Sequence, residues 1–370
     1  MNRPTLLCSL ALAVALAACQ KTPEPAAPDA APGATASAEQ APAAKEGAAE
    51  PAAADATGAK AEPAKAEPAK AEPAAQDAVA GVSLTEFPEV TDTPKVRLLE
   101  AGEGEKKELR YRYSPESKHQ MVMRLEMGMS MKVGERSMPE VKLPAMIMKA
   151  DITMGKPEGD AISYEFSVPS APEVEAGEGV SETVAQGLKT SLAAMTGLHG
   201  KASVDARGAT RDGHFELEGK DSPQLAQLVD SMGQSMRQMS VPLPEEAVGK
   251  GARWQALQRM QMGGMTIYQV GEYTLESIDG DRLELDVKLS QLGPKQQMQP
   301  PGLPPGVSAE LLSMVGEGSG HMKLDLTALV PVSTTKIRSD SSMRMTSKDE
   351  AQEMSMSMNM EMEIKPGDAQ

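Results

Sequence analysis

Large apolar residues recur at every second position in two long stretches of the chain, residues 121–131 and 354–364, with mostly small or polar residues between them. In the first stretch the polar set includes Arg124, Glu126 and Ser130, and the alternating apolar set is Met121, Met123, Leu125, Met127, Met129 and Met131. Successive side chains of a strand point to opposite faces, so a period of two separates these sets onto two faces. Both stretches therefore predict long strands with one apolar and one solvated face, which is typical of antiparallel sheets.

The same alternation predicts strands elsewhere, joined by turns rich in glycine. The turns fall at Gly159 in "GKPEGD", at Gly208, at Gly263–Gly264 and at Asp279–Gly280. The predicted strands occupy residues 108–113, 146–154, 162–168, 201–217 as two short strands, 253–275 as a hairpin, 283–289, 322–330 and 336–346.

Helix signals are few. Ser caps open predicted helices at 181–195 and 222–239, and a short one is expected at 306–315. The second helix carries an apolar stripe at helical spacing that includes Met232 and Met236. The expected fold is mainly β (α+β), a curved antiparallel sheet or half-barrel of about ten to twelve strands with two or three helices on its concave apolar face.

The N-terminus has the layout of an export signal, with basic Arg3, an apolar segment at 5–18 that is too short to span a bilayer, and then "LAAC" at 16–19. This motif resembles the lipobox of bacterial lipoproteins. The resemblance implies that residues 1–18 are cleaved and that Cys19 is lipidated, which anchors the chain to a membrane without spanning it. The alternative is an ordinary secretory signal with an incidental cysteine. In the lipoprotein sorting rule of enteric bacteria, Gln20 after the modified cysteine favours the outer membrane of the cell envelope.

Residues 19–80 consist almost entirely of Ala, Pro, Glu, Lys, Gly and Asp, with three copies of "AKAEP" at 59–73. Such a segment has too little apolar surface to fold and is expected to be a disordered, extended spacer. A wall-binding or partner-docking tail is the alternative. Residues 81–370 are then a single β-rich domain.

Charge and cysteine content narrow the partners. The formal net charge is −16, which argues against nucleic acid and against adsorption to anionic lipid headgroups. Cys8 lies within the signal segment, so Cys19 is the only cysteine expected in the mature chain and no intramolecular disulfide is expected.

The chain has 27 methionines but only three phenylalanines, five tyrosines and one tryptophan. Three hypotheses account for the methionine rows: an ordinary core, a cup for a lipid or other apolar ligand, since flexible thioethers suit variable apolar partners, and a Cu(I) site. The candidate ligand-lining residues are Met121, Met123, Met127, Met129, Met131, Met146, Met148, Met154, Met232, Met236, Met354, Met356, Met358, Met360 and Met362.

Catalytic signals are weak. The four histidines are scattered, and "STTK" at 333–336 matches an SxxK spacing but lies in an alternating strand rather than at a helix N-terminus. "GEGSGH" at 316–321 lacks the GxSxG order, and no nucleotide fingerprint is present. A non-enzymatic protein without cofactor or resident metal is expected.

The succession of "LRYRY" at 109–113, a methionine-alternating hairpin, "VDARG" at 204–208 and "VPLPEEAVGKGARW" at 241–254 resembles a family of uncharacterised β-rich bacterial lipoproteins, over most of residues 105–365. The expected architecture is also similar to the half-barrels of periplasmic lipoprotein and lipid carriers. That second similarity implies a cup with a helical lid that holds acyl chains. The protein partners are not predicted.

Overall fold

The computed structural model describes residues 77–90, 93–177, 179–217, 241–262, 264–298, 306–347 and 350–367. The predicted signal segment, Cys19, nearly all of the spacer and the helix expected at 222–239 lie outside these residues.

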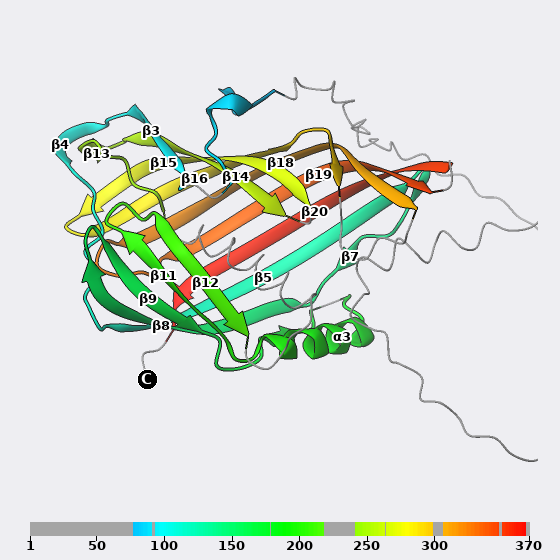
Figure 1. Cartoon of the computed structure of the whole chain (residues 1–370), viewed down its shortest axis with the longest axis horizontal. Helices are drawn as coiled ribbons and strands as arrows, with labels where there is room; N and C mark the ends of the chain where they lie inside the picture. The colour runs from blue at the N-terminus through cyan, green and yellow to red at the C-terminus, as the bar shows by residue number, and fades with distance from the viewer. Residues whose placement is uncertain are drawn as a thin grey trace, which may run out of the picture. The chain divides into compact units, whose positions relative to one another are not determined.

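Within the described residues, one antiparallel sheet contains sixteen strands, and twelve of them form a continuous path (Figure 1). In sheet order the path is β12 (Thr210–Leu217), β11 (Leu198–Asp205), β9 (Ala161–Ser167), β8 (Ala145–Glu158), β5 (Lys118–Val133), β20 (Glu350–Pro366), β19 (Val332–Ser347), β18 (Val307–Asp325), β16 (Arg282–Gly293), β15 (Met265–Asp279), β14 (Arg253–Met262) and β3 (Lys95–Glu100). The path ends at β12 and β3 without closing. The expected mainly β fold built on one large antiparallel sheet is confirmed, whereas the expected number of about ten to twelve strands is too small.

Short strands flank this path or pair apart from it. Beside the long strands lie β6 (Arg136–Ser137) and β7 (Val141–Lys142) on β5, β10 (Glu173–Glu175) on β8, and β17 (Gln296–Met298) on β18. Two separate pairs are β1 (Ala78–Val79) with β2 (Val82–Ser83), and β4 (Glu103–Lys107) with β13 (Val248–Lys250).

The predicted hairpin turns are confirmed. Gly264 joins β14 to β15 with a φ of 79°, and Gly280 joins β15 to β16 with a φ of 62°. Side chains with a Cβ rarely adopt this left-handed region, so glycine lets each turn close tightly between strands in register.

The helical expectations are confirmed only in part. The first helix is present as α3 (Glu182–Leu192), followed by a 3-10 turn at Ala193–Met195. α3 contains no buried residue and contacts β10, so it is not a lid over an apolar face. The helix expected at 306–315 is wrong, because that segment is the start of β18, paired with β17 and β19. No helix in the described part of the chain is long and apolar enough to cross a membrane.

The strand predicted at 108–113 is also wrong, although its buried side chains were placed correctly. Leu109 and Tyr111 are buried, but the segment joins no strand ladder. The backbone N–H of Tyr111 donates to Ala206 at 2.8 Å, and that of Arg112 donates to Leu326 at 2.7 Å. Through these two hydrogen bonds the segment bridges the β11–β12 turn and the residue that follows β18.

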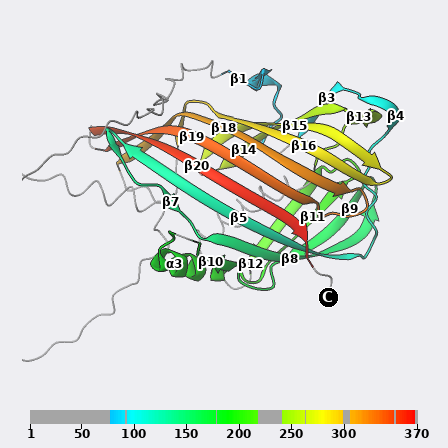
Figure 2. The ribbon, with the colours of Figure 1, turned by 180° about the vertical axis from the view of Figure 1, so that it is seen from behind.

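Two apolar clusters cover the same face of the sheet near the start of β5, and together we call them the closed end. Leu329 and Val330, from the β18–β19 connection, pack with residues of β8, β9 and β11, which lie several strands away in sheet order. This contact across the sheet identifies the apolar face as the inner face of the curved sheet, and Figure 2 shows the long strands β5, β20 and β19 from the other side.

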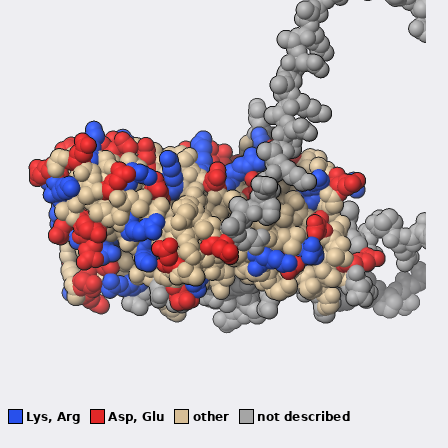
Figure 3. Space-filling view, turned by 90° about the horizontal axis from the view of Figure 1, so that it is seen from above, with Lys and Arg blue, Asp and Glu red and all other residues tan. Residues whose placement is uncertain are grey.

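The outer face carries charge of both signs. Figure 3 shows acidic and basic side chains intermixed over one view of the molecule rather than gathered into a field of one sign. Val82 of the β1–β2 hairpin and Phe87, which follows the 3-10 turn at Leu84–Glu86, pack on this outer face with Leu257, Val270 and Leu292.

Candidate functional site

The methionine runs of β5 and β20 lie directly opposite each other. Antiparallel pairing sets Met127 against Met360, Met129 against Met358, and Met131 against Met356. We call these six residues the opposed methionines. Side chains opposite each other in an antiparallel pair have Cβ atoms about 4.5–5.5 Å apart, so the thioethers form one continuous strip on the inner face. The sequence predicted the shared face but not this pairing.

Burial divides the predicted methionines into two groups. Met121, Met148 and Met154 are 1%, 8% and 1% exposed and belong to the closed end, where Met123 and Met362 pack against them. For Met121, Met148 and Met154 the ordinary-core interpretation holds. The partly exposed positions are the opposed methionines, Met146 and Met354, together with Met123 and Met362, which pack against the closed end.

Small residues lie beside the opposed methionines on the inner face. On β19, Ser339 pairs with Met358 and Ser341 with Met356, and on β18, Gly318 pairs with Ile337. A Cβ added at Gly318 would lie 2.8 Å from the backbone oxygen of Lys336 and 2.9 Å from Cγ1 of Ile337. Glycine here lets neighbouring groups close over the strand, which permits the sheet to bend toward its inner face.

The inner face also contains polar groups that sequence reasoning missed. Ser339, Thr335 and Gln291 are buried, and Nε2 of Gln291 donates to Oε1 of Gln269 at 2.7 Å. The signal was present in residues 333–341, where Ser333, Thr335, Ser339 and Ser341 share one parity. The inner face therefore carries methionine on β5 and β20, and on the next three strands it mixes small, hydroxyl and amide side chains with the apolar Ile337 and Leu289.

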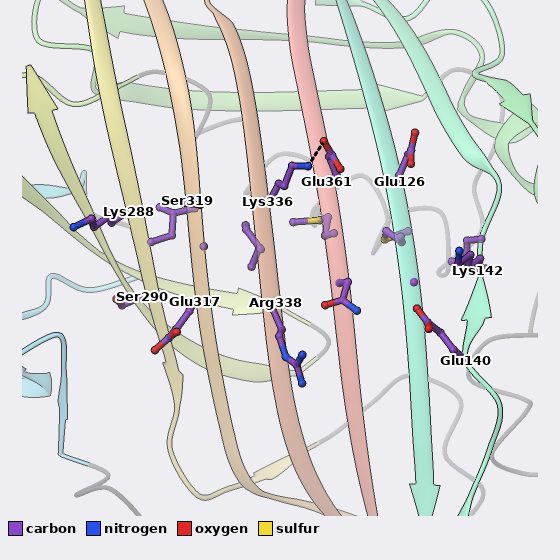
Figure 4. Close-up of a pocket in the computed structure, with 18 residues that line it drawn as sticks. Glu126, Glu140, Lys142, Lys288, Ser290, Glu317, Ser319, Lys336, Arg338 and Glu361 are labelled. Atoms are coloured by element: carbon purple, nitrogen blue, oxygen red, sulfur yellow. Dashed lines mark ion pairs between the residues drawn. The ribbon is translucent and has the colours of Figure 1, made fainter. Parts of the chain in front are cut away.

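A hollow of about 830 Å³, lined largely by charged side chains, lies on the outer face (Figure 4). Two of the opposed methionines, Met127 and Met360, also contribute to its lining. Two rows of side chains line it across β16, β18, β19, β20 and β5, because pairing aligns Lys336 with Ser319 and Glu361, and Arg338 with Glu317. Its charged lining residues are Lys142, Lys288, Lys336, Arg338, Glu126, Glu140, Glu317 and Glu361.

Two of the basic side chains that line the hollow form ion pairs, one with another lining residue and one with Asp340 nearby. Nζ of Lys336 lies 3.0 Å from Oε1 of Glu361, and Nε of Arg338 lies 3.3 Å from Oδ2 of Asp340. A hydrogen bond from Ser357, with support from Arg338, lowers the pKa of the Asp340 carboxyl. With four basic and four acidic lining residues, the hollow has no net attraction for a polyanion.

Histidines in the described residues pair with near neighbours. Nδ1 of His321 lies 3.0 Å from Oδ1 of Asp286, and Nε2 of His119 lies 2.9 Å from Oγ of Ser117. Burial lowers the pKa of His119. Within the part of the chain that the structure describes, no group of three or more His, Cys, Asp or Glu side chains is placed to hold a metal ion.

Aromatic side chains concentrate at the closed end. The ring of Trp254 stacks on Tyr273 with centroids 5.6 Å apart, and its Nε1–H donates to the carbonyl of Pro242 at 2.9 Å. Burial raises the pKa of Tyr273 to about 12, and burial, partly offset by a hydrogen bond from Thr210, raises that of Tyr164 to about 12. The pKa values of two further tyrosines are raised mainly by burial: Tyr111 and Tyr113.

Three predicted site residues lie outside the described residues: Cys19, Met232 and Met236. The lipidation site and the lid helix therefore stay predictions.

The described part of the chain defines a mainly β protein with one large open antiparallel sheet. Residues 228–328 match the model of a family described as "Family of unknown function (DUF6263)". This match agrees with the expectation of an uncharacterised family over that range, and it carries no information about a lipid anchor.

No curated protein matches the chain. Among solved structures, the chain is similar to that in "Crystal structure of Pseudomonas aeruginosa OpdQ", with 6% identity over 67% of this chain and 97% of that chain. The TM-score is 0.18, and a likeness at this level carries no argument about fold or function.

Proposed function

We propose that this protein is a non-enzymatic bacterial envelope lipoprotein, anchored through lipid on Cys19, whose sheet binds an acyl chain or similar apolar molecule along the opposed methionines. The observation that carries the proposal is the register of β5 and β20, which puts three methionine pairs opposite each other while leaving them partly exposed. Covering a methionine contributes about 1.5–3 kcal/mol, so partly exposed thioethers favour an apolar occupant.

The dimensions of the strip suit one acyl chain. From Met127 to Met131 the strand advances four residues, or about 14 Å at about 3.4 Å per residue. The hydrocarbon core of a bilayer is about 30 Å thick, so one leaflet's chains extend about 15 Å. Methionine adapts to occupants of different shape because its side chain is unbranched and polarizable.

Binding is tested with the full-length chain carrying Cys19→Ser, which removes the lipid-attachment thiol. Native mass spectrometry with organic extraction should find a co-purifying apolar molecule, and a fluorescent fatty acid should bind saturably. Met129→Gln with Met358→Gln places two amides in the middle of the strip and should weaken probe binding about tenfold.

The matched control is Ser130→Gln with Asn359→Gln, on the same two strands but on the outer face. It should leave probe affinity unchanged. A wild-type chain that never binds the probe saturably contradicts the proposal, and tight uptake of Cu(I) in its place would favour the copper hypothesis.

The anchor has its own test. Cys19→Ser should release the protein from membranes or leave an unprocessed precursor, whereas Cys8→Ser, within the signal segment, should be processed and anchored normally. Normal processing and detergent partitioning of the Cys19→Ser chain would contradict lipidation at this residue.

A further inference from the structure

The opposed methionines are more exposed than the methionines of the closed end. Both cysteines of the chain are at positions 8 and 19, so the sheet has no thiol that could intercept an oxidant. Thioethers are oxidised in proportion to their exposure. The opposed methionines are partly exposed, whereas Met121 and Met154, on the same inner face, are each 1% exposed.

We propose that the opposed methionines are a site of oxidation to methionine sulfoxide by peroxide, and that this modification lowers the affinity of the inner face for apolar ligands. The second half of this inference rests on the proposed function. In the reaction the sulfur lone pair attacks one oxygen of H2O2, an S–O bond forms as the O–O bond breaks, and the departing hydroxide takes the remaining proton to leave as water. Sulfur loses two electrons, and the peroxide is reduced.

The register of β5 and β20 brings oxidised methionines together, so that oxidation makes the middle of the strip polar. Met129 and Met358 face each other across two strands, so their oxidation places two S=O dipoles side by side in the middle of the apolar strip. The neighbouring side of the inner face already carries Ser339 opposite Met358. Sulfoxides would therefore extend a polar surface across the strip and interrupt contact with an apolar chain.

The sheet itself should survive this change. β5 and β20 pair through backbone groups over residues 121–133 and 354–366, and the opposed methionine side chains take no part in that ladder. The clusters of the closed end, including Met121, Met148 and Met154, are buried away from the oxidant. Oxidation thus alters the chemistry of the face while the fold persists.

The first measurement is a time course with hydrogen peroxide on the full-length Cys19→Ser chain, followed by peptide mass mapping of each methionine. The opposed methionines should gain one oxygen about tenfold faster than Met121 and Met154. Equal rates at all these positions, or faster reaction at Met121 and Met154, would overturn the proposed site.

The second measurement is binding of the fluorescent fatty acid before oxidation, after oxidation, and after treatment with methionine sulfoxide reductases and a dithiol. Affinity should fall about tenfold and then return, with unchanged circular dichroism. A chain with all six opposed methionines changed to Leu should bind the probe but lose its sensitivity to peroxide. If the wild type binds the probe and oxidation does not change its affinity, the proposed effect of oxidation on binding is wrong. If the wild type never binds the probe, both the proposed function and the effect of oxidation on binding fail. The mass map then tests the proposed oxidation site by itself.

Discussion

Met121 and Met129 lie on the same strand and the same face, yet their surroundings differ. Met121 is 1% exposed and packs with the aromatic and aliphatic residues of the closed end, whereas Met129 is partly exposed opposite Met358. The residue type and its alternation are identical at the two positions. Whether a methionine of this face is core or partly exposed is therefore set by the segments that pack over it, such as the loop containing Leu329 and Val330.

The largest expected effect is loss of the closed end at alkaline pH. Burial raises the pKa of Tyr164 and Tyr273 to about 12 and also raises those of Tyr111 and Tyr113. A raised folded pKa contributes stability that is complete below the ordinary value of 10.0 and is lost as pH rises through the folded value. Between these two pKa values, each such tyrosine should lower the free energy of unfolding by about 1.4 kcal/mol per pH unit.

Ultraviolet titration of the tyrosine phenols, alongside circular dichroism, measures whether ionisation and unfolding occur together. Tyr111 and Tyr164, which are buried, and Tyr113 and Tyr273, which are partly buried, should ionise together with unfolding, well above pH 10. In urea they should titrate near their ordinary pKa. Phenolate formation near pH 10 in a chain that stays folded would contradict the burial of these rings.

The next effect concerns the aromatic packing of the closed end. Trp254→Ala removes a fully buried ring, its stack on Tyr273 and its hydrogen bond to Pro242, and should lower the free energy of unfolding by about 3–5 kcal/mol. The control Val332→Ala truncates a side chain that is 48% exposed and should cost about 0.5 kcal/mol or less. Urea melts compare the two variants, and equal costs would mean that Trp254 is not part of the core.

A smaller effect compares the two methionines directly. Met121→Ala should cost about 2–5 kcal/mol because it leaves a cavity, whereas Met129→Ala should cost about 1 kcal/mol or less. Equal destabilisation in urea melts would show that the strip is packed as tightly as the closed end.

The smallest effect is electrostatic. A hydrogen bond from Arg253, at 2.8 Å, lowers the pKa of Glu272 below its ordinary value of 4.5. A depressed pKa contributes stability above the ordinary value that is lost as pH falls through the folded value. Glu272→Gln should therefore lose up to about 1 kcal/mol at neutral pH and flatten the stability profile below about pH 4.5. The control is Glu276→Gln, at an exposed position on the same strand. It should change neither the free energy of unfolding at neutral pH nor the shape of the stability profile.

Alternation along single strands was readable from the sequence, because the period of two depends only on local geometry. It placed Met127 and Met129 on one face, and glycine placed the turns at Gly264 and Gly280. The apolar spacing of the segment at 306–315 fits both periods, so the local pattern predicts a helix there. Pairing with β17 and β19 makes the segment a strand.

The pairing of β5 with β20 was beyond sequence reasoning, because these strands are more than 200 residues apart in the chain. Local patterns carry no information on which distant strands become neighbours. For the same reason the sequence could not separate core methionines from exposed ones, since Met121 is buried by residues of other strands and loops. The segment at 108–113 shows the converse: its buried parity was read correctly, but Arg110 bonds to the carbonyls of Pro244 and Glu245 and the segment joins no ladder.

The most direct test of the central claim is photo-crosslinking with a fatty acid that carries a diazirine in its chain, followed by peptide mapping of the full-length Cys19→Ser protein. Label should appear at the opposed methionines in peptides from β5 and β20, and excess unlabelled fatty acid should abolish it. Competable labelling confined to the closed end or to the outer-face residues of β16, β18 and β19, or no competable labelling at all, would contradict binding along the opposed methionines.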